Sequence, residues 1–477
     1  MFDKKLVKKW IRIYNEIKNT NDYIEIYILL MIRERRFMNN KVIYQLNGRP
    51  KLKESIPLGL QHVLAMFVGN VTPLIIISNV LNLDAQTKTS LIQCAMFISG
   101  IVTLMQCYRI GPIGAKLPIV MGTSFAFVPV ATAIGVKYGM QGILGACLVG
   151  GIVEVLIGGI VLKYIRQYFP PVVTGIVVLT MGIALLPTGV NYFAGGTGAV
   201  DFASPSNLLL GTIVLITVIF FKQYTKGMLS ISSILIGLVV GYIVAIPMGK
   251  IDFSSLSQAQ FLSIPSPFKF GFEFHIDAIV AMIFVYLVST VETIGNITAI
   301  ADSGLKREAS DKEIIGGVIA DGLGSFIAAI FNVLPNTSFG QNVGIISMTK
   351  IVNRFVVATG ACILILAGIF PKVGALISLM PPSVLGGASI VMFSMIVVSG
   401  IRLITTETLT ERNAMIVAVS LGLGLGVSYV PGFFDAFPES IQLIFGESKT
   451  VLPAILAVIL NIVLPKEKVC KDKSLTA

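Results

Sequence analysis

The chain has 477 residues, of which 55% are hydrophobic and 13% charged, and its mean hydropathy is +0.85. A soluble globular domain carries about 25% charged residues, so this composition cannot cover a water-facing surface. It excludes a soluble enzyme, a disordered chain and a secreted disulfide scaffold. Because the apolar runs are continuous rather than alternating, they also exclude an outer-membrane barrel. The sequence therefore predicts an all-α polytopic membrane protein.

Fourteen apolar segments follow one another along the chain. The first seven lie at 57–81, 89–107, 116–136, 141–163, 170–190, 207–222 and 229–248. After a polar stretch at 249–275, the second seven lie at 276–301, 313–333, 336–349, 353–370, 380–401, 412–430 and 451–464. The third and tenth segments are polar or short enough to be broken helices. We therefore expect 14 transmembrane segments, two of them broken.

Positive charge is distributed unevenly about these segments. With the N-terminus inside, the predicted cytoplasmic loops and C-terminal tail carry 17 Lys and Arg residues, against 6 on the opposite side. The positive-inside rule therefore places both termini in the cytoplasm, with the protein in a bacterial-type plasma membrane. The net charge of +11 is a topology signal on this interpretation, and no nucleic-acid partner is expected.

The two ends of the chain are basic tails. We divide the chain into an N-terminal cytoplasmic tail, a first seven-span repeat, an extracytoplasmic linker, a second seven-span repeat and a C-terminal cytoplasmic tail, at 1–55, 56–250, 251–275, 276–465 and 466–477. The apolar stretch at 24–32 is too short to span a bilayer and has no small-residue cleavage site. The first tail is either a basic segment on the membrane surface or an upstream extension with Met38 as the true initiator.

Three short patterns occur twice in the same order. Gly-Asn-Val-Thr at 69–72 returns as Gly-Asn-Ile-Thr at 295–298. Thr-Ser-Phe at 123–125 returns at 337–339, and the Pro-Pro pair at 170–171 returns at 381–382. Collinear matches at a nearly constant offset indicate an internal repeat. A unit with an odd number of spans places its second copy upside down, which is the inverted repeat of secondary transporters.

Glu292 lies deep in the apolar eighth segment, after Val-Tyr-Leu-Val-Ser-Thr-Val. An ionised carboxyl there costs at least about 2.5–3.5 kcal/mol, so such a group normally marks a substrate or proton site. The alternative is a structural carboxyl paired with a hydroxyl. Asn296 lies four residues on and hence on the same helical face, where it can support the site.

Several other polar residues interrupt the apolar segments. Gln341 and Asn342 follow the tenth-segment break, where their amides either bind substrate or only satisfy backbone groups freed by the break. Asp321 is either a proton group or a structural tie. His62 is either a proton relay or a fixed hydrogen-bonding group. Glu154 sits among glycine pairs, and we interpret it as part of helix packing without a further role.

No pattern indicates an enzyme or a metal protein. The five cysteines show no CxxC spacing, and only two histidines exist. The sequence contains no Walker loop, nucleophile elbow or metal cluster. Without an ATPase module, an ion gradient is the available energy source, and the protonatable Glu292 suggests protons. We therefore expect no cofactor and no metal.

Residues 341–350, Gln-Asn-Val-Gly-Ile-Ile-Ser-Met-Thr-Lys, resemble the signature of the nucleobase–ascorbate transporter family, Gln/Glu/Pro-Asn-x-Gly-x-x-x-x-Thr-Lys/Arg/Gly. The Gln-His pair at 61–62, Glu292 and the Asp-Gly pair at 321–322 resemble further motifs of that family. The resemblance runs from about residue 42 to 464. It implies a seven-plus-seven inverted repeat with a core domain (segments 1–4 and 8–11) and a gate domain (segments 5–7 and 12–14). It also implies homodimers, and transport by movement of core against gate.

The resemblance assigns roles to individual residues. It implies that Glu292 is the essential carboxyl that hydrogen-bonds the base, that Gln341 is the second side-chain anchor and that Gly340 offers its backbone. It also implies that Phe125 and Phe339 flank the purine ring.

Gly69 lies where the family brings the first segment against the substrate. The chain departs from the family at Asn296, where many purine carriers have Asp. Proton coupling then rests on Glu292, with help from Asp321 or His62.

The resemblance implies a substrate class as well. Family members with Gln at the first signature position tend to carry xanthine or uric acid, whereas uracil carriers tend to have Glu there. We therefore expect a proton-coupled importer of oxidised purines. A uracil carrier of the same family and an anion exchanger or channel on the same fold are the alternatives. An intramembrane enzyme is disfavoured because a nucleophile or metal set is missing.

Overall fold

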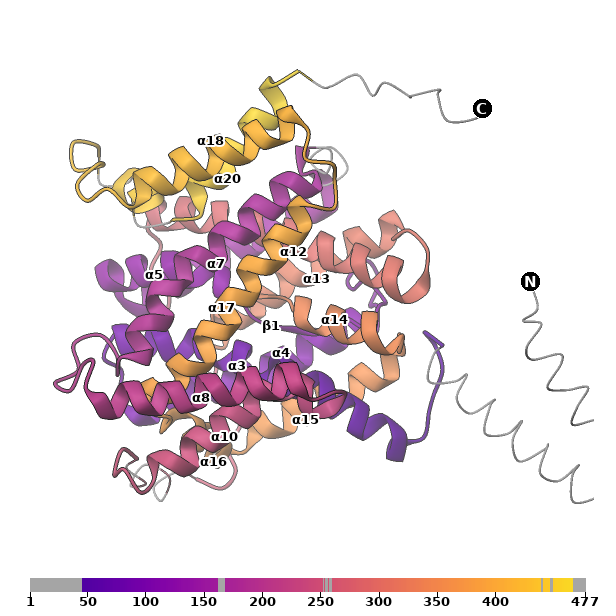
Figure 1. Cartoon of the computed structure of the whole chain (residues 1–477). Helices are drawn as coiled ribbons and strands as arrows, with labels where there is room; N and C mark the ends of the chain where they lie inside the picture. Colours follow the sequence, from indigo (N-terminus) through magenta and orange to yellow (C-terminus); the bar gives the residue numbers. More distant parts are fainter. Residues whose placement is uncertain are drawn as a thin grey trace, which may run out of the picture.

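The computed structural model describes residues 45–161, 168–251, 253, 256, 260–438, 441–446 and 449–465. Most of these residues form helices that pack into one body (Figure 1). Most of the predicted N-terminal tail, with the alternative initiator Met38, and the predicted C-terminal tail lie outside the described residues.

The first half of the described chain contains mostly long helices. In order, its elements are α3 (Leu52–Val80), α4 (Ala85–Cys107), strand β1 (Met121–Thr123), the 3₁₀ turn η1 (Phe125–Phe127), α5 (Val128–Leu156), the π-helical turn η2 (Ile157–Val161), α7 (Pro171–Phe193), α8 (Pro205–Tyr224), α9 (Met228–Ile231) and α10 (Ser233–Ala245). Proline is the first residue of α7 and of α8. At this position a backbone N–H would make no hydrogen bond within the helix, so the lack of one in proline costs nothing.

The second half also contains mostly helices, together with a second short strand. Its elements are α12 (Ile276–Leu305), α13 (Asp311–Ile330), strand β2 (Asn336–Ser338), α14 (Gly340–Thr349), α15 (Arg354–Ile369), α16 (Pro371–Ser378), α17 (Pro382–Ile404), α18 (Glu411–Ser428), the π-helical turn η4 (Gln442–Gly446) and α20 (Val451–Val463). A capping box formed by Ser310 and Glu313 begins α13.

Among the described residues, 8 helices are long and apolar enough to cross a membrane, or up to 9 if α15 and α16, bent by 82°, count as one span. The chain is thus a multi-pass helical membrane protein. The count of 14 segments and the seven-plus-seven order stay predictions.

In the first half of the predicted third segment, most residues are not part of a helix. Residues 116–120 are irregular, β1 follows, and helix begins only at η1 and α5. The predicted third and fourth segments then run on as α5, with a break at Gly139, where the backbone has φ 69° and ψ −170°. A residue with a side chain rarely adopts that conformation, so glycine at this position permits the kink.

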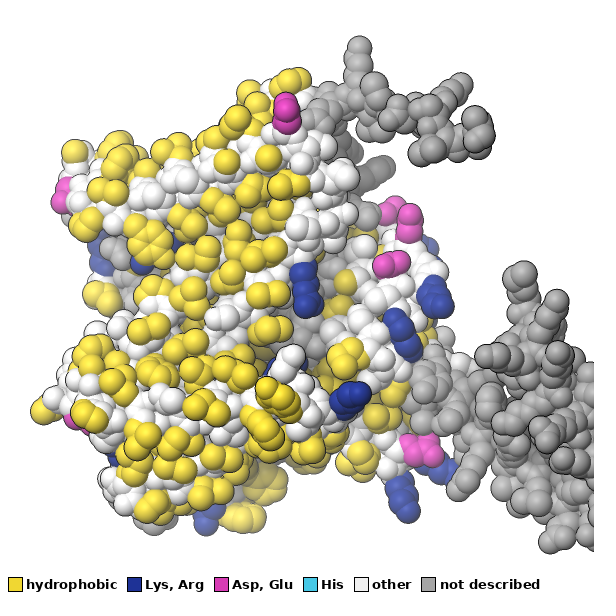
Figure 2. Space-filling model, viewed as in Figure 1, with side chains coloured by type: hydrophobic (Ala, Val, Ile, Leu, Met, Phe, Trp, Pro, Cys, Tyr) yellow, Lys and Arg dark blue, Asp and Glu magenta, His cyan; other side chains and the backbone are white. Residues whose placement is uncertain are grey.

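The outer surface is largely apolar. Figure 2 shows hydrophobic side chains over α8, α17 and α18, with many of the visible Lys, Arg, Asp and Glu side chains towards the right of the view and others at its left and lower edges. Exposed Leu209, Ile216 and Phe220 on α8 and Leu423 on α18 belong to this surface. An apolar band flanked by charge is what a bilayer requires of a protein that it surrounds.

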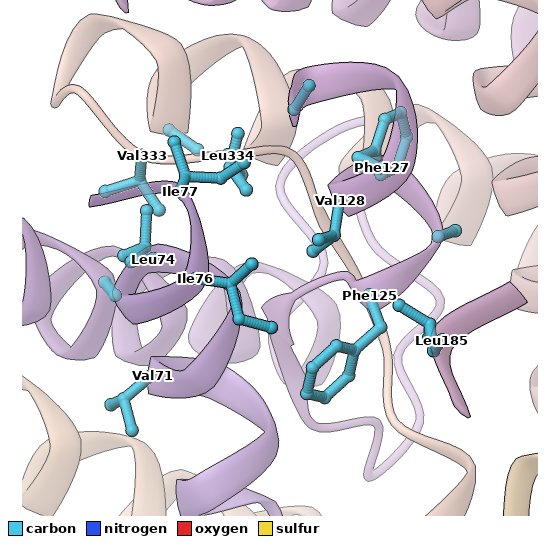
Figure 3. Packing of buried hydrophobic residues seen from close by; sticks show 14 of the residues in the cluster. Val71, Leu74, Ile76, Ile77, Phe125, Phe127, Val128, Leu185, Val333 and Leu334 are labelled. Carbon is cyan, nitrogen blue, oxygen red and sulfur yellow. The ribbon is translucent and has the colours of Figure 1, made fainter. Parts of the chain in front are cut away.

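The helices pack in two groups. The helices α3, α4, α5, α12, α13 and α15 contact one another most extensively, and α7, α8, α10, α17, α18 and α20 form the second group. Figure 3 shows one place where the groups approach, because Phe125 lies beside Leu185 of α7. In the same view, Leu74 and Ile77 of α3 lie near Val333 and Leu334 ahead of β2.

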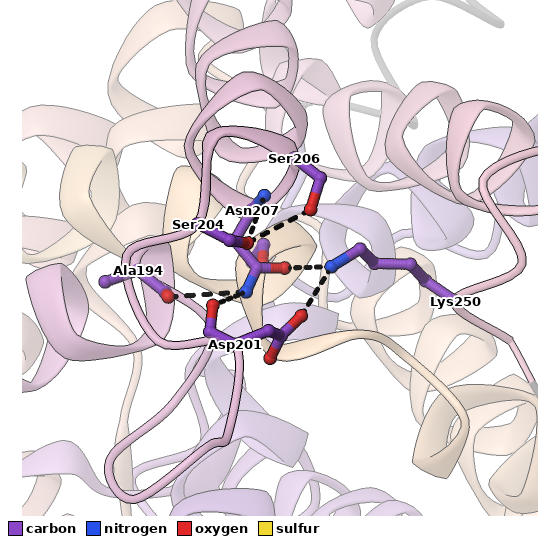
Figure 4. A network of polar contacts seen from close by, with 7 residues as sticks. Ala194, Asp201, Ser204, Ser206, Asn207 and Lys250 are labelled. Carbon is purple, nitrogen blue, oxygen red and sulfur yellow. Dashed lines mark hydrogen bonds and ion pairs between the residues drawn. The ribbon is translucent and has the colours of Figure 1, made fainter.

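A polar network joins the ends of three elements in the second group (Figure 4). Lys250, after α10, donates to Asp201 Oδ2 at 2.8 Å and to Asn207 Oδ1 at 2.5 Å. Asn207 Oδ1 also accepts from Ser383 Oγ of α17 at 3.0 Å. The hydrogen bond from Lys250 holds the pKa of Asp201 below its ordinary value. The network therefore fastens the α7–α8 loop to α10 and α17.

Candidate functional site

Strands β1 and β2 form an antiparallel pair inside the helical body. Gly122 lies opposite Thr337, Met121 opposite Ser338 and Thr123 opposite Asn336, and all six residues are buried. The pairing satisfies backbone groups that would otherwise be unpaired where no water or lipid partner exists. The parts of the sequence predicted as the third and tenth segments therefore lie side by side.

Two asparagines from the repeated Gly-Asn pattern hold the two strands. Asn70 Oδ1 on α3 accepts hydrogen bonds from the Thr123 backbone N–H at 2.8 Å and from Ser99 Oγ at 2.7 Å. Asn296 Nδ2 on α12 donates to the Ser338 carbonyl oxygen at 2.9 Å and to Ser338 Oγ at 2.8 Å. The two matching asparagines of the sequence repeat thus each contact one of the two strands, although Asn70 accepts from a backbone N–H and Asn296 donates to a backbone carbonyl oxygen.

Glu292 lies one helical turn before Asn296 on α12. Its side chain is half-buried, and its Oε2 is inaccessible, with no hydrogen-bond donor among the described residues. Asn296 Oδ1 lies close to the start of α14, because a Cβ atom at Gly340 would be 3.5 Å from it. Glu292 Oε2 is therefore an unused acceptor one helical turn from Asn296, which approaches the start of α14.

The N-terminus of α14 is open. Phe339 precedes it without a side-chain cap, and Gly340 and Gln341 are exposed. The first N–H groups of a helix have no intrahelical partner and carry a partial positive charge. They can therefore donate to a carbonyl oxygen of a bound molecule, and the exposed Gln341 amide adds both a donor and an acceptor at the same place.

Phe339 forms an aromatic wall next to this helix end. A Cβ atom at Gly69 of α3 would lie only 2.6 Å from Phe339 Cε1, and one at Gly122 of β1 only 2.7 Å from Phe339 Cε2. The ring therefore fits between two backbones because both positions lack a side chain. This contact brings Gly69 and Phe339 together.

Phe125 lies on the β1 side and meets the other helix group. Its ring contacts Phe393 of α17 edge-on, with centroids 5.1 Å apart and planes at 84°. Only 9% of Phe125 is exposed. The second predicted aromatic residue is therefore placed where the two groups of helices touch.

His62 and Asn342 form a separate tie between α3 and α14. Asn342 Nδ2 donates to His62 Nδ1 at 3.1 Å and to the His62 carbonyl oxygen at 2.9 Å. With Nδ1 accepting, the neutral ring carries its proton on Nε2. Both residues are buried, so the contact fixes α14 against α3.

Asp321 lies behind α12 and contacts a hydroxyl cluster. Thr293 Oγ1 donates to Asp321 Oδ2 at 2.6 Å and lies 3.0 Å from Ser338 Oγ. Thr290 Oγ1 donates at 2.9 Å to Glu154 Oε1, so Glu154, to which the sequence assigned only a packing role, belongs to the same cluster. The repeated threonines around Glu292 were the sequence signal for this cluster.

The described part of the chain contains no group of three or more His, Cys, Asp or Glu side chains that could hold a metal ion. Of the cysteines in this part, Cys94, Cys107 and Cys147 are buried and Cys362 is exposed, all as free thiols.

A family profile described as a permease family matches residues 53–433. The chain belongs to this family, the nucleobase–ascorbate transporters. It is therefore a permease and not an enzyme. This confirms the family that the signature at 341–350 indicated, and with it the assignment of the chain to membrane transport.

Named relatives of the permease are similar over nearly their whole length. The xanthine permease XanQ of Escherichia coli is 39% identical over 439 residues, which cover 89% of this chain and 94% of that protein. The uric acid permease PucK of Bacillus subtilis is 39% identical over 406 residues, covering 85% and 94%.

Solved structures with the same fold are more distant in sequence. The transmembrane domain of the cyanobacterial bicarbonate transporter BicA has a TM-score of 0.51 at 13% identity, covering 86% of this chain and 97% of that one. Murine Slc26a9, in the inward-facing state, has a TM-score of 0.57 at 12% identity and covers 86% and 68%. At this identity the likeness concerns the fold alone.

Proposed function

We propose that this permease imports oxidised purine nucleobases, xanthine or uric acid or both, across the plasma membrane by coupling their uptake to protons. The observation that carries the proposal is the unpartnered Glu292 Oε2, one helical turn from Asn296, whose side chain approaches the open N-terminus of α14. The names of the xanthine and uric acid permeases at 39% identity support this substrate class.

The chemistry of an oxopurine suits this arrangement. Its flat ring presents N–H donors and carbonyl acceptors in alternation. Glu292 accepts a ring N–H, the Gln341 amide donates to one carbonyl and accepts from a neighbouring N–H, and the Gly340 backbone N–H donates to another carbonyl. Phe339 and Phe125 offer aromatic faces or edges to the ring.

Transport on this proposal moves one helix group against the other. The group with α3, α12 and α14 carries the binding residues, and the group with α7 and α17 closes over the ring at Phe125 and Phe393. Protonation of Glu292, with Asp321 and His62 in support, couples the movement to the proton gradient. No cofactor takes part. Cytoplasmic termini and a homodimer within the bilayer belong to the same proposal.

A uracil carrier of the same family is the rival within this class. The Gln at position 341 argues against it, because family members with Gln at the first signature position tend to carry xanthine or uric acid, whereas uracil carriers tend to have Glu there. An anion exchanger would need a cationic site, whereas Glu292 occupies this one.

Uptake of labelled xanthine into cells or proteoliposomes tests the proposal. Unlabelled xanthine and uric acid should compete, and uracil should not. Uptake should rise as external pH falls and collapse with a protonophore. Glu292→Gln should abolish concentrative uptake while the protein stays in the membrane, and Glu407→Gln in the α17–α18 loop is the matched control. Full pH-dependent accumulation by Glu292→Gln would refute the assigned role of Glu292, and competition by uracil alone would refute the substrate class.

A further inference from the structure

Glu154 of α5 and Asp321 of α13 meet in the interior, behind the candidate site. Both are 0% exposed, and their carboxyl groups lie close enough to interact, because a Cβ atom at Gly322, the residue after Asp321, would be 3.0 Å from the Glu154 Cβ atom. Glycines bring the helices this close: a Cβ atom at Gly151 would be 2.9 Å from the Gly322 carbonyl oxygen, and one at Gly322 would be 2.8 Å from the Gly151 carbonyl oxygen. The glycine pairs around Glu154 therefore allow two acidic side chains to face each other.

Each carboxyl has one hydroxyl donor and one oxygen without any. Thr290 donates to Glu154 Oε1 and Thr293 to Asp321 Oδ2, at 2.9 Å and 2.6 Å. No donor among the described residues reaches Glu154 Oε2 or Asp321 Oδ1. Two ionised carboxylates cannot hydrogen-bond to each other, and an unpaired buried charge is strongly unfavourable. One proton shared between the two carboxyl groups satisfies both.

Among the described side chains around Glu154 and Asp321, none supplies a positive charge, so a proton is the available counter-charge for the pair. The titratable groups that face the pair are Tyr286 and Glu292 of α12, and the Tyr286 hydroxyl donates to the Cys147 carbonyl oxygen at 2.8 Å. No Lys, Arg or His in the described part of the chain acts on either carboxyl.

A chain of hydrogen bonds joins the pair to the candidate site. Thr293 Oγ1 contacts both Asp321 Oδ2 and Ser338 Oγ, at 2.6 Å and 3.0 Å. Ser338 is the last residue of β2, and the next residues are Phe339 and Gly340. A change in the protonation of the pair can therefore reach the strand that carries the start of α14.

We propose that Glu154 and Asp321 form one proton-binding site beside β2, which binds a proton during transport in addition to Glu292, with Glu154 as necessary as Asp321. With one shared proton the pair has a net charge of −1. Uptake of a second proton forms one further O–H bond and makes the pair neutral, and its release on the other side of the membrane restores the first state. The transport role of this pair of carboxyl groups rests on the proposed function, whereas the sharing of a proton between them does not.

Infrared spectroscopy of the purified, substrate-free protein tests the protonation. At neutral pH the C=O stretch of a protonated carboxyl should be present, and Glu154→Gln and Asp321→Asn should each remove or shift it, while Glu292→Gln leaves that band in place. Thr290→Val deletes only the donor to Glu154 Oε1 and should shift the same band, which keeps the test available if a carboxyl variant fails to fold. A band unaffected by both Glu154→Gln and Thr290→Val would overturn the proposal.

Proteoliposomes test the coupling. Glu154→Gln should lose accumulation of labelled xanthine driven by a pH gradient, so that internal and external concentrations become equal, but keep exchange of labelled for unlabelled xanthine. Glu154→Asp should restore part of the accumulation. If Glu154→Gln accumulates xanthine to the wild-type level, the coupling role is overturned. The coupling role is also overturned if the folded variant no longer exchanges labelled for unlabelled xanthine. If the wild-type protein transports no purine at all, the proposed function fails. The infrared result would still decide whether Glu154 and Asp321 share a proton.

Discussion

Asn296 of α12 and Ser338 of β2, 42 residues apart in the chain, are joined by two hydrogen bonds from one amide group. The amide donates to the Ser338 carbonyl oxygen and hydroxyl, and thereby fixes β2 to the helix that carries Glu292. Asn70 holds β1 in the corresponding place of the other half. Asn296 therefore positions the strand that leads into α14, a role that an Asp at this position could not fill with its acceptor oxygens alone.

Substitution of Asn296 should weaken substrate binding. Asn296→Ala leaves the buried Ser338 carbonyl oxygen unpaired, which costs about 1–3 kcal/mol. If that cost falls on the bound state, affinity for xanthine drops about tenfold to hundredfold, measured as the KM of uptake or by equilibrium binding. Thr298→Ala is the matched control, because its hydroxyl bonds only to the Ile294 carbonyl oxygen of its own helix. Equal affinity in both variants would contradict the positioning role of Asn296.

The two glycines of the repeated Gly-Asn pattern should differ in their tolerance of a side chain. Gly69→Ala places a Cβ atom 2.6 Å from the Phe339 ring, so the ring must move and xanthine uptake should fall sharply. Gly295→Ala has nothing within 4 Å of its new Cβ atom and should leave uptake close to that of the wild type. Initial uptake rates, normalised to the amount of protein in the membrane, compare the two. Similar losses of uptake in both variants would show that contact with Phe339 is not the reason why Gly69→Ala impairs transport.

Gln341 should set selectivity for oxopurines. An ionised Glu can only accept hydrogen bonds, so Gln341→Glu would face a purine carbonyl with repulsion at a cost of about 1–3 kcal/mol. Xanthine or urate affinity should therefore fall about tenfold to hundredfold, with uracil as the substrate to test for weak new uptake. Gln341→Asn keeps donor and acceptor but retracts them by one methylene, and should be milder. Unchanged purine affinity in Gln341→Glu would make Gln341 a structural residue of α14.

Asp84 should make the stability of the protein depend on acid pH. It caps α4, and hydrogen bonds from the Thr87 hydroxyl and backbone N–H hold the pKa of Asp84 below its ordinary value. Because the pKa of Asp84 is lower in the folded than in the unfolded state, its ionised carboxyl stabilises the fold at pH values above the unfolded-state pKa. This stabilisation is lost as the pH falls through the folded-state pKa. Asp84→Ala should cost about 1 kcal/mol at neutral pH and less in acid.

Asp84→Asn is the matched control, because Asn caps helices as well as Asp but does not titrate. Thermal unfolding of the purified protein in detergent, at neutral pH and below about pH 4, compares the variants. A destabilisation by Asp84→Ala that is the same at both pH values would contradict the titration of the cap.

Hydropathy and local motifs determined the class of this protein. Apolar runs identified several helices to within a few residues, as for α12, which begins at the predicted residue 276, whereas the predicted third segment begins with irregular chain and β1. The signature at 341–350 indicated the family, and the carboxyl of Glu292 inside an apolar run indicated a candidate site. These features lie within windows of one helix or one loop, because a bilayer imposes its requirement on each segment separately.

Only the tertiary structure decided which distant residues meet. The pairing of β1 with β2, the Asn342 contact to His62 and the facing carboxyl groups of Glu154 and Asp321 join parts of the chain that no local pattern connects. Glu154 alone looks like part of a glycine-rich packing face, and its partner becomes visible only when α5 and α13 come together at Gly151 and Gly322. Such contacts depend on how whole helices pack, because in a bilayer close approach is set by small residues and polar pairs rather than by hydrophobicity.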